Sequence, residues 1–244
     1  AAGIGWIKKS ADQGYVLAQR KLGEIYYAQD PALKRDLPRA AEYFAKAAAQ
    51  GDLQSQYFTA RFYHLGMGVE KDPAKAAEWY ARVDQNEDLL DEDNELIAEY
   101  VMGAQSQLGM LYRDGIGVAK DPAAAARWFR RAAMLGSPGS QFRLGAAYET
   151  GAGVAADPVE AYRWYGLAAS NLASPFGAEF FDDAGAKEAS EAMARLDKTL
   201  PAATLALAKA AAEDELRLQF QLGSAYSWGM RPTQGGGYWR VGPP

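Results

Sequence analysis

The sequence contains no cysteine and only one histidine, His64. Without cysteine there are no disulfides, thiolate metal ligands or cysteine nucleophiles, and the chain suits either a reducing or an oxidising compartment. A single histidine excludes any metal site that needs several histidine ligands. No apolar run approaches the roughly 20 residues of a membrane span, and a net charge of −5 without a basic tract argues against a nucleic-acid binder. We therefore expect no membrane span, no nucleic-acid ligand, no cofactor and little room for an enzyme.

β-branched residues are also scarce, whereas alanine, the best helix former, is the commonest residue. At 49% hydrophobic and 23% charged, the 244 residues can bury a substantial core. This composition favours an all-α protein. The chain opens on Ala1 without a Met or a signal segment, so we expect a processed or trimmed product. We expect a protein that is periplasmic or exported rather than cytoplasmic.

An internal repeat of about three dozen residues organises most of the chain. Its first element is Leu-Gly followed three residues later by Tyr, with Thr-Ala replacing Leu-Gly in one copy. The tyrosines of four successive copies are Tyr26, Tyr63, Tyr112 and Tyr148, and a half copy ends the series at Tyr226. Packing groups at this spacing form one stripe of an α-helix, here called helix A. Between Tyr63 and Tyr112 extra residues are inserted.

Each copy continues into a second helix, here called helix B. Three copies carry Gly-x-Gly-Val and then Asp-Pro, at Asp72-Pro73, Asp121-Pro122 and Asp157-Pro158. Glycine adopts positive φ and ends helix A, whereas Asp caps helix B and Pro begins it. An aromatic pair follows, and we expect the Trp128 ring and its counterparts to fill the gap between neighbouring repeats. A glutamine recurs after the small helix-A residue, at Gln19, Gln56, Gln105, Gln141 and Gln219, which predicts an architectural role.

These motifs resemble those of the Sel-one-like repeat (SLR) proteins, relatives of the tetratricopeptide solenoids, over residues 18–172. The resemblance implies an all-α, right-handed α-solenoid of antiparallel helix pairs, in a bacterial protein that binds other proteins, usually without catalysis. The first copy departs from the pattern, because Asp30-Pro31 and Asp36 replace Gly-x-Gly-Val.

The expected divisions follow from the copies. They are residues 1–17 (helix B of a preceding unit), four repeats at 18–51, 52–102, 103–136 and 137–172, capping helices within 173–217, and a half repeat with a glycine-rich tail at 218–244. The second repeat holds an acidic insertion at about 84–99. The capping helices are predicted at 186–200 and 204–219, and a separate helix A is expected to restart at Leu222.

Helix-A side chains that vary between copies are the candidate partner contacts, because a ligand is contacted by particular repeats only. In a tetratricopeptide-like stack helix A lines the concave face, and the second, third, sixth and ninth positions after the small residue lie off the core stripe. The predicted partner-binding residues are Arg20, Glu24, Tyr57, Phe58, Arg61, His64, Met110, Arg113, Phe142, Arg143 and Glu149. Aromatic, Met and Arg residues are enriched at interface hot spots, although Phe58 and Phe142 alternatively pack between repeats. Cations outnumber glutamates on this face, which indicates an acidic segment in a protein partner.

Two other features are candidates for a metal site and for a catalytic residue. Asp84, Asn86, Asp88 and Glu95 stand at positions of a calcium-binding EF-hand loop, but Leu89 occupies the place where that loop needs Gly, which favours a solvated acidic helix extension or loop. His64 has no Ser nucleophile and orienting Asp at a readable spacing, so a structural or surface role is favoured over a general base.

Three function hypotheses remain. The first is a non-catalytic scaffold or adaptor that binds a protein in the groove between the second and fourth repeats. The second is an inhibitor, such as an immunity protein that occludes a secreted toxin. The third is a hydrolase, which the missing nucleophile–base pair disfavours. These patterns identify neither the partner nor the oligomeric state.

Overall fold

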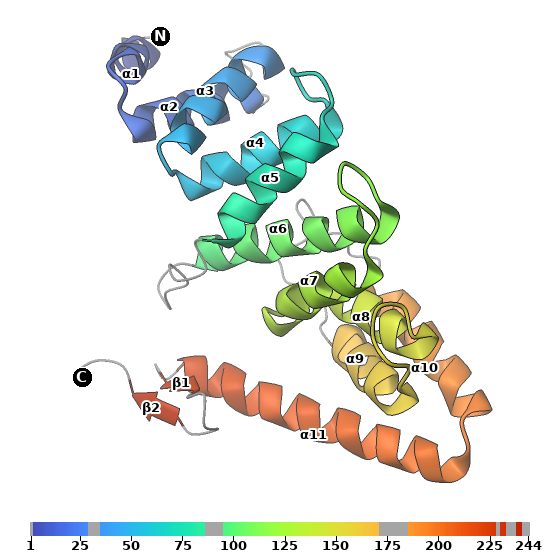
Figure 1. Cartoon of the computed structure of the whole chain (residues 1–244). Helices are drawn as coiled ribbons and strands as arrows, with labels where there is room; N and C mark the ends of the chain where they lie inside the picture. The colour runs from blue at the N-terminus through green and yellow to red at the C-terminus, as the bar shows by residue number, and fades with distance from the viewer. Residues whose placement is uncertain are drawn as a thin grey trace. The chain divides into compact units, whose positions relative to one another are not determined.

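The structure is a computed structural model that describes residues 2–28, 35–85, 95–170, 185–227, 230–232 and 238–240. Its helices (Figure 1) are α1 (Ala2–Asp12), α2 (Val16–Tyr27), α3 (Leu37–Ala49), α4 (Leu53–Leu65), α5 (Pro73–Asp84), α6 (Glu95–Asp114), α7 (Pro122–Met134), α8 (Pro138–Thr150), α9 (Pro158–Ser170), α10 (Gly185–Thr199) and α11 (Ala202–Ser227). The strands β1 (Met230–Pro232) and β2 (Tyr238–Arg240) pair as an antiparallel hairpin. The all-α prediction is confirmed, and no helix in the described ranges is long and apolar enough to cross a membrane.

The chain divides into two compact units. Unit 1 comprises Ala1–Leu90 and Leu96–Asp121, and unit 2 comprises Asp91–Glu95 and Pro122–Pro244. Helix A and helix B of one repeat pack together as an antiparallel pair: α2 with α3 and α4 with α5 in unit 1, and α8 with α9 in unit 2. Each unit therefore buries its own core between stacked helices.

The turn between helix A and helix B is closed by the same two hydrogen bonds of an Asp in the first, second and fourth repeats. The Asp72 side chain accepts a hydrogen bond from the Lys75 backbone N–H at 3.0 Å, and the Asp72 N–H donates to the Tyr63 carbonyl at 2.9 Å. Asp36 makes both bonds too, to Arg39 and Tyr26. The first repeat thus reaches the same closure without Gly-x-Gly-Val, while its Asp30-Pro31 lies outside the described residues.

The second glycine of each Gly-x-Gly forms the contact between repeats. A Cβ added to Gly68 would lie 2.5 Å from the Leu37 carbonyl oxygen, at the start of the preceding helix B. The same construction at Gly117 would meet the backbone N of Ala74 at 2.5 Å, and at Gly153 that of Ala123 at 2.6 Å. These glycines have φ between +70° and +79°. Both the conformation and the close approach require glycine.

The second ring of each aromatic pair is buried, while the first ring is only half-buried in three of the four pairs, which corrects the prediction for Trp128. Phe129 is buried, whereas Trp128 is half-buried with the Arg131 guanidinium 5.2 Å from its ring. Adjacent helical residues point about 100° apart, so the two rings of a pair meet different surroundings. Trp164 of α9 is the one first ring of a pair that is also buried. The glycine of the Leu-Gly motif admits the second ring, because a Cβ on Gly23 would lie 2.7 Å from Phe44.

The recurring glutamines tie each helix A to the end of the preceding helix B. The Nε2 atoms of Gln19, Gln56 and Gln141 donate to the carbonyl oxygens of Ala11, Ala48 and Ala133 at 3.3, 3.5 and 3.1 Å. All three glutamines are buried. Each bond spans eight residues and satisfies a carbonyl in the last turn of helix B. The architectural prediction is confirmed for these glutamines.

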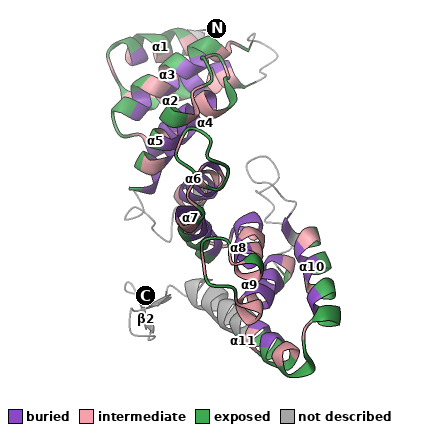
Figure 2. Cartoon of the chain, turned by 45° about the vertical axis from the view of Figure 1, so that its right-hand side comes forward, coloured by how far each residue is buried: buried purple, intermediate pink, exposed green. Residues whose placement is uncertain are grey.

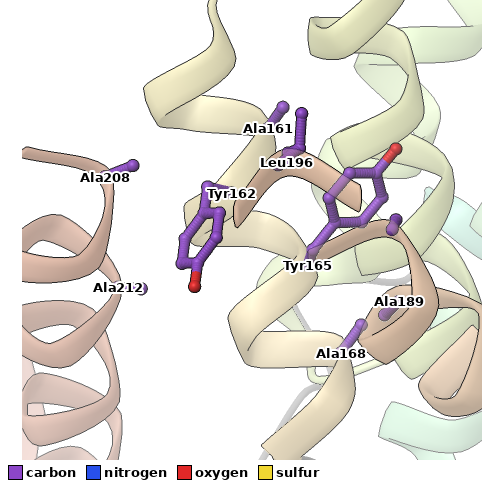
Figure 3. Packing of buried hydrophobic residues seen from close by; sticks show 9 residues of the cluster. Ala161, Tyr162, Tyr165, Ala168, Ala189, Leu196, Ala208 and Ala212 are labelled. Carbon is purple, nitrogen blue, oxygen red and sulfur yellow. The ribbon is translucent and has the colours of Figure 1, made fainter. Parts of the chain in front are cut away.

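The C-terminal helices pack against the fourth repeat. A single apolar cluster joins Ala161, Tyr162, Tyr165 and Ala168 of α9 to Ala189, Ala192 and Leu196 of α10 and to Ala208 and Ala212 of α11. Figure 3 shows α9 between the two other helices. Helix α11 runs unbroken to Ser227, so the expected restart of a separate helix A at Leu222 is wrong.

Candidate partner-binding surface

The second, sixth and ninth helix-A positions of the first repeat face the next helix A. Arg20 Nη1 lies 3.0 Å from a carboxylate oxygen of Asp52, the N-cap residue of α4. Glu24 Oε1 accepts from Gln54 Nε2 at 3.2 Å. The Tyr27 ring packs 5.5 Å from the ring of Phe58. These side chains vary between copies because each matches its neighbour, so their variation gives no evidence of a ligand.

Tyr57 and Phe58 are buried, with 2% and 5% of their surface exposed (α4 is largely purple in Figure 2). The Phe58 ring stacks on Phe44 at 4.8 Å, and Tyr57 lies 5.3 Å from Tyr100. The prediction that these two rings contact a partner is therefore wrong, and the alternative that Phe58 packs between repeats is right. Burial raises the pKa of Tyr57 and raises the pKa of Tyr100 to about 12.

The covering ring of Tyr100 comes from the insertion. In the other repeats helix A begins three residues before its glutamine, whereas α6 begins at Glu95, ten residues before Gln105. Two further helical turns thus precede the register of the repeat. A helix extension, one of the two alternatives for the insertion, forms here, and the Tyr100 ring covers Tyr57 and Phe58, two of the predicted partner contacts.

Asp84, the first of the proposed calcium ligands, is buried and accepts a 2.8 Å hydrogen bond from Gln105 Nε2. It stands at the end of α5, where the other repeats offer a carbonyl to their glutamine. Asn86 and Asp88 lie outside the described residues, and of Glu95 only the backbone is described. Asp84 thus belongs to the packing between repeats, and the residues that the structure describes contain no cluster of three or more metal-ligating side chains.

Arg61 and His64 lie on the partly exposed side of α4. The Arg61 guanidinium stands 6.0 Å from the Tyr57 ring. His64 Nδ1 lies 3.5 Å from the Tyr80 hydroxyl, at the limit of a hydrogen bond. Partial burial, with Lys71 and Arg61 nearby, lowers the pKa of His64. The imidazole is therefore neutral at pH 7, in keeping with a structural role.

Met110 and Arg113 follow on α6. Met110 is half-buried and Arg113 is exposed. Both guanidinium contacts of Arg113 are to the carboxylate of Asp114, at 2.8 Å. Arg20, Lys21 and Arg113 thus all have carboxylate partners within this chain. The cationic character predicted for the helix-A face is largely neutralised.

In unit 2 the predicted residues hold α10 in place. Glu149 accepts from the Tyr165 hydroxyl at 2.7 Å and from Arg195 of α10 at 2.8 Å. Phe142 packs 5.6 Å from Tyr165 and against the cluster shared with α10. Phe142 and Glu149 are therefore internal contacts rather than free partner contacts. Arg143, at the third position, remains half-buried.

Some exposed apolar residues were missed by the sequence argument. Trp6 and Leu17 are 71% and 66% exposed, and Tyr15 is also exposed. Leu17 stands at the register position of Gln54, the residue that contacts the preceding helix A. Leu17 could have been identified from the sequence, because it is an apolar residue at a position where another repeat has a polar residue that contacts the preceding helix A.

Sel1 repeat is the family description that matches this chain, at residues 1–15, 16–52, 53–82, 103–137 and 138–171, more than half of its length. The crystal structure of c5321, a protective antigen present in uropathogenic Escherichia coli strains displaying an SLR fold, is 34% identical with a TM-score of 0.60, over 70% of this chain and 33% of that one. A Sel1 repeat protein from Oxalobacter formigenes is 26% identical with a TM-score of 0.54, over 75% and 74%.

The match to a curated relative covers a shorter segment of the chain. DAP3-binding cell death enhancer 1 from Rattus norvegicus is 33% identical over 79 residues, which are 32% of this chain and 15% of that protein. The chain therefore spans only a small part of the length of this relative and about a third of c5321. The repeat matches, the capped helix pairs and the SLR-fold likeness agree: the chain belongs to the Sel1 repeat family.

Proposed function

We propose that this chain is a non-catalytic scaffold that binds a protein partner on the helix-A face of unit 1. This face comprises Lys21 of α2, Arg61 of α4, and Tyr100, Gln107 and Met110 of α6, all exposed or half-buried. Sel1 repeats mediate protein–protein interaction, and the match of five of them to this chain is the observation that carries the proposal.

The face combines an anchored ring with two cationic side chains. Tyr100 is held between Tyr57, at 5.3 Å, and Phe58, at 6.3 Å. A ring that is already fixed loses little conformational entropy when a partner covers it. Lys21 is more exposed, with its ammonium 2.9 Å from Glu24. An anchored aromatic ring on the same face as cationic and polar side chains is typical of an interface whose centre is apolar.

The proposed absence of catalysis is supported by how the carboxylates are used. Asp36, Asp52, Asp72 and Asp157 accept hydrogen bonds from backbone N–H groups at the first turns of helices. Glu149 is held by a tyrosine and an arginine. Carboxylates held in caps and ion pairs are poor candidates for proton transfer.

Affinity capture with charge-reversed baits tests the proposal. The full chain, the double variant Lys21→Glu with Arg61→Glu, and a control with Lys120→Glu and Arg127→Glu are used to capture proteins from the source organism. The control changes the net charge equally at two exposed positions that are not part of a helix A, Lys120 before α7 and Arg127 on α7. We expect a specific protein to be captured by the wild type and the control and lost with the first variant. Equal capture by all three baits would refute the assignment of the face.

A further inference from the structure

Unit 1 contains a pocket of about 620 Å³ on a different surface, where α1, the end of α2 and the start of α3 meet. Its lining residues are Lys8, Tyr26, Arg35, Asp36, Leu37, Pro38 and Arg39. Three of the seven side chains are cationic and one is anionic. The pocket is thus basic in a chain whose net charge is −5.

Aromatic rings position the three cations. The Lys8 ammonium lies 5.8 Å and the Arg39 guanidinium 5.6 Å from the centre of the Tyr26 ring, and Arg35 lies 5.2 Å from the Tyr27 ring. Cation–π contacts restrain a cation without cancelling its charge. The pocket therefore holds its positive groups near one another while their charge stays available.

Carboxylates of the chain neutralise little of this charge. Asp36 caps α3 and lies 3.4 Å from Arg39. Within the described ranges, Lys8 and Arg35 have no carboxylate within ion-pair distance. This contrasts with Arg20, Lys21 and Arg113 of the A helices, which pair with carboxylates of this chain.

The other repeats do not repeat the cluster. Counting from the recurring glutamine and from the capping Asp gives the residues at the equivalent positions. The counterparts of Lys8 are Ala45, Ala81 and Arg130, those of Arg35 are Lys71, Lys120 and Ala156, and those of Arg39 are Lys75, Ala124 and Glu160. Only the first repeat has a cation at all three positions, so the cluster is not required by the repeat fold.

We propose that this pocket binds an acidic peptide segment of a protein partner, with the carboxylates of that segment lying between Lys8, Arg35 and Arg39. The inference rests on the proposed function only in taking the ligand to be part of a protein. Guanidinium groups bind carboxylates through two parallel hydrogen bonds, which gives direction as well as charge. Complementary charge also speeds association with an acidic segment.

A peptide fits these features better than a single small anion. Lys8, Arg35 and Arg39 are exposed, and exposed ion pairs taken singly contribute only about 0–1 kcal/mol. A segment with several carboxylates engages all three cations together. Leu37, Pro38 and the edge of Tyr26 supply apolar walls for side chains between the acidic residues.

Fluorescence anisotropy tests the pocket with a synthetic, fluorescein-labelled peptide of Glu-Leu-Gly repeats, and with a Gln-Leu-Gly peptide as the uncharged probe. The proteins are the wild-type chain, Lys8→Glu with Arg35→Glu, and the control Lys120→Glu with Arg127→Glu. Lys120 is the counterpart of Arg35 in the third repeat, which lacks the other two cations. Far-UV circular dichroism checks the fold, and Lys8→Gln with Arg35→Gln replaces the reversed variant if that variant unfolds.

We expect the wild type and the control to bind the glutamate peptide equally, and the pocket variant to bind it about ten-fold more weakly or worse at low salt. Binding should weaken as salt rises. Unchanged affinity of the pocket variant, or equal binding of the Gln-Leu-Gly peptide, would overturn the proposal. Displacement of the peptide by inorganic phosphate at the same concentration of charge would assign the pocket to small anions instead. Lys21 and Arg61 are untouched, so failure here leaves the helix-A proposal to its own test.

Discussion

Replacing Gly68 by alanine should destabilise unit 1 far more than the same change at another glycine with positive φ. Gly68 has a φ of +70°, and its added Cβ would lie 2.5 Å from the Leu37 carbonyl oxygen of the preceding repeat. The backbone conformation alone costs an alanine about 1–2 kcal/mol. Because the obstructing atoms are backbone, the repeats must shift, and overpacking of this kind costs about 1–3 kcal/mol more. The expected loss of unfolding free energy is therefore about 2–5 kcal/mol.

Gly51 is the matched control. Its φ is +90°, and among the described residues no heavy atom beyond its chain neighbours lies within 4 Å of an added Cβ. Gly51→Ala should thus cost only the conformational part, about 1–2 kcal/mol. Urea denaturation of both variants, followed by far-UV circular dichroism, measures the difference. Equal losses would refute the conclusion that the second glycine of the motif holds neighbouring repeats together.

The remaining predictions concern the core, the glutamine bonds and the single histidine. Phe129→Ala should lower the unfolding free energy by about 3–5 kcal/mol, as truncations of core aromatic residues do, whereas Trp128→Ala should lower it by about 1 kcal/mol. If urea titrations gave the reverse order, the prediction that Trp128 fills the gap between repeats would stand after all. Gln141→Ala should lower the unfolding free energy by about 0.5–1.5 kcal/mol, because the Ala133 carbonyl loses its side-chain donor but keeps the Gly136 N–H at 3.0 Å; an unchanged denaturation midpoint would contradict this. The proton NMR titration of His64 should have its midpoint below the ordinary 6.5. Since the fold disfavours the protonated form, stability should hold above pH 6.5 and decline as the pH falls through that value, and a midpoint above 6.5 would refute the assignment.

The helix pairs could be predicted from the sequence because their determinants are local. Asp72 before Pro73 caps a helix whatever surrounds it, and Gly66 and Gly68 end one. The glutamines were recognised as architectural because they recur. Their acceptors were not predicted, since a bond from Gln141 to Ala133 depends on how one repeat sits on the next.

The partner-binding surface was predicted less well, for a geometric reason. The spacing of residues fixes which side chains share a helix face, but not which way that face turns within a stack. Arg20 and Glu24 vary between copies because they pair with Asp52 and Gln54, and the sequence argument took this variation for ligand contact. Glu149 meets Arg195 across 46 residues, and no local pattern reports such a contact.

Site-specific photocrosslinking tests the central claim most directly, namely that the helix-A face of unit 1 is where a protein partner binds. A photoreactive residue is placed at Lys21, on α2, and in a second protein at Glu78, an exposed position on α5. The account predicts that one partner protein is crosslinked from Lys21 and not from Glu78, and that adding the Arg61→Glu substitution to the Lys21 probe weakens the crosslink. Crosslinking of the same protein from Glu78 and not from Lys21 would contradict it.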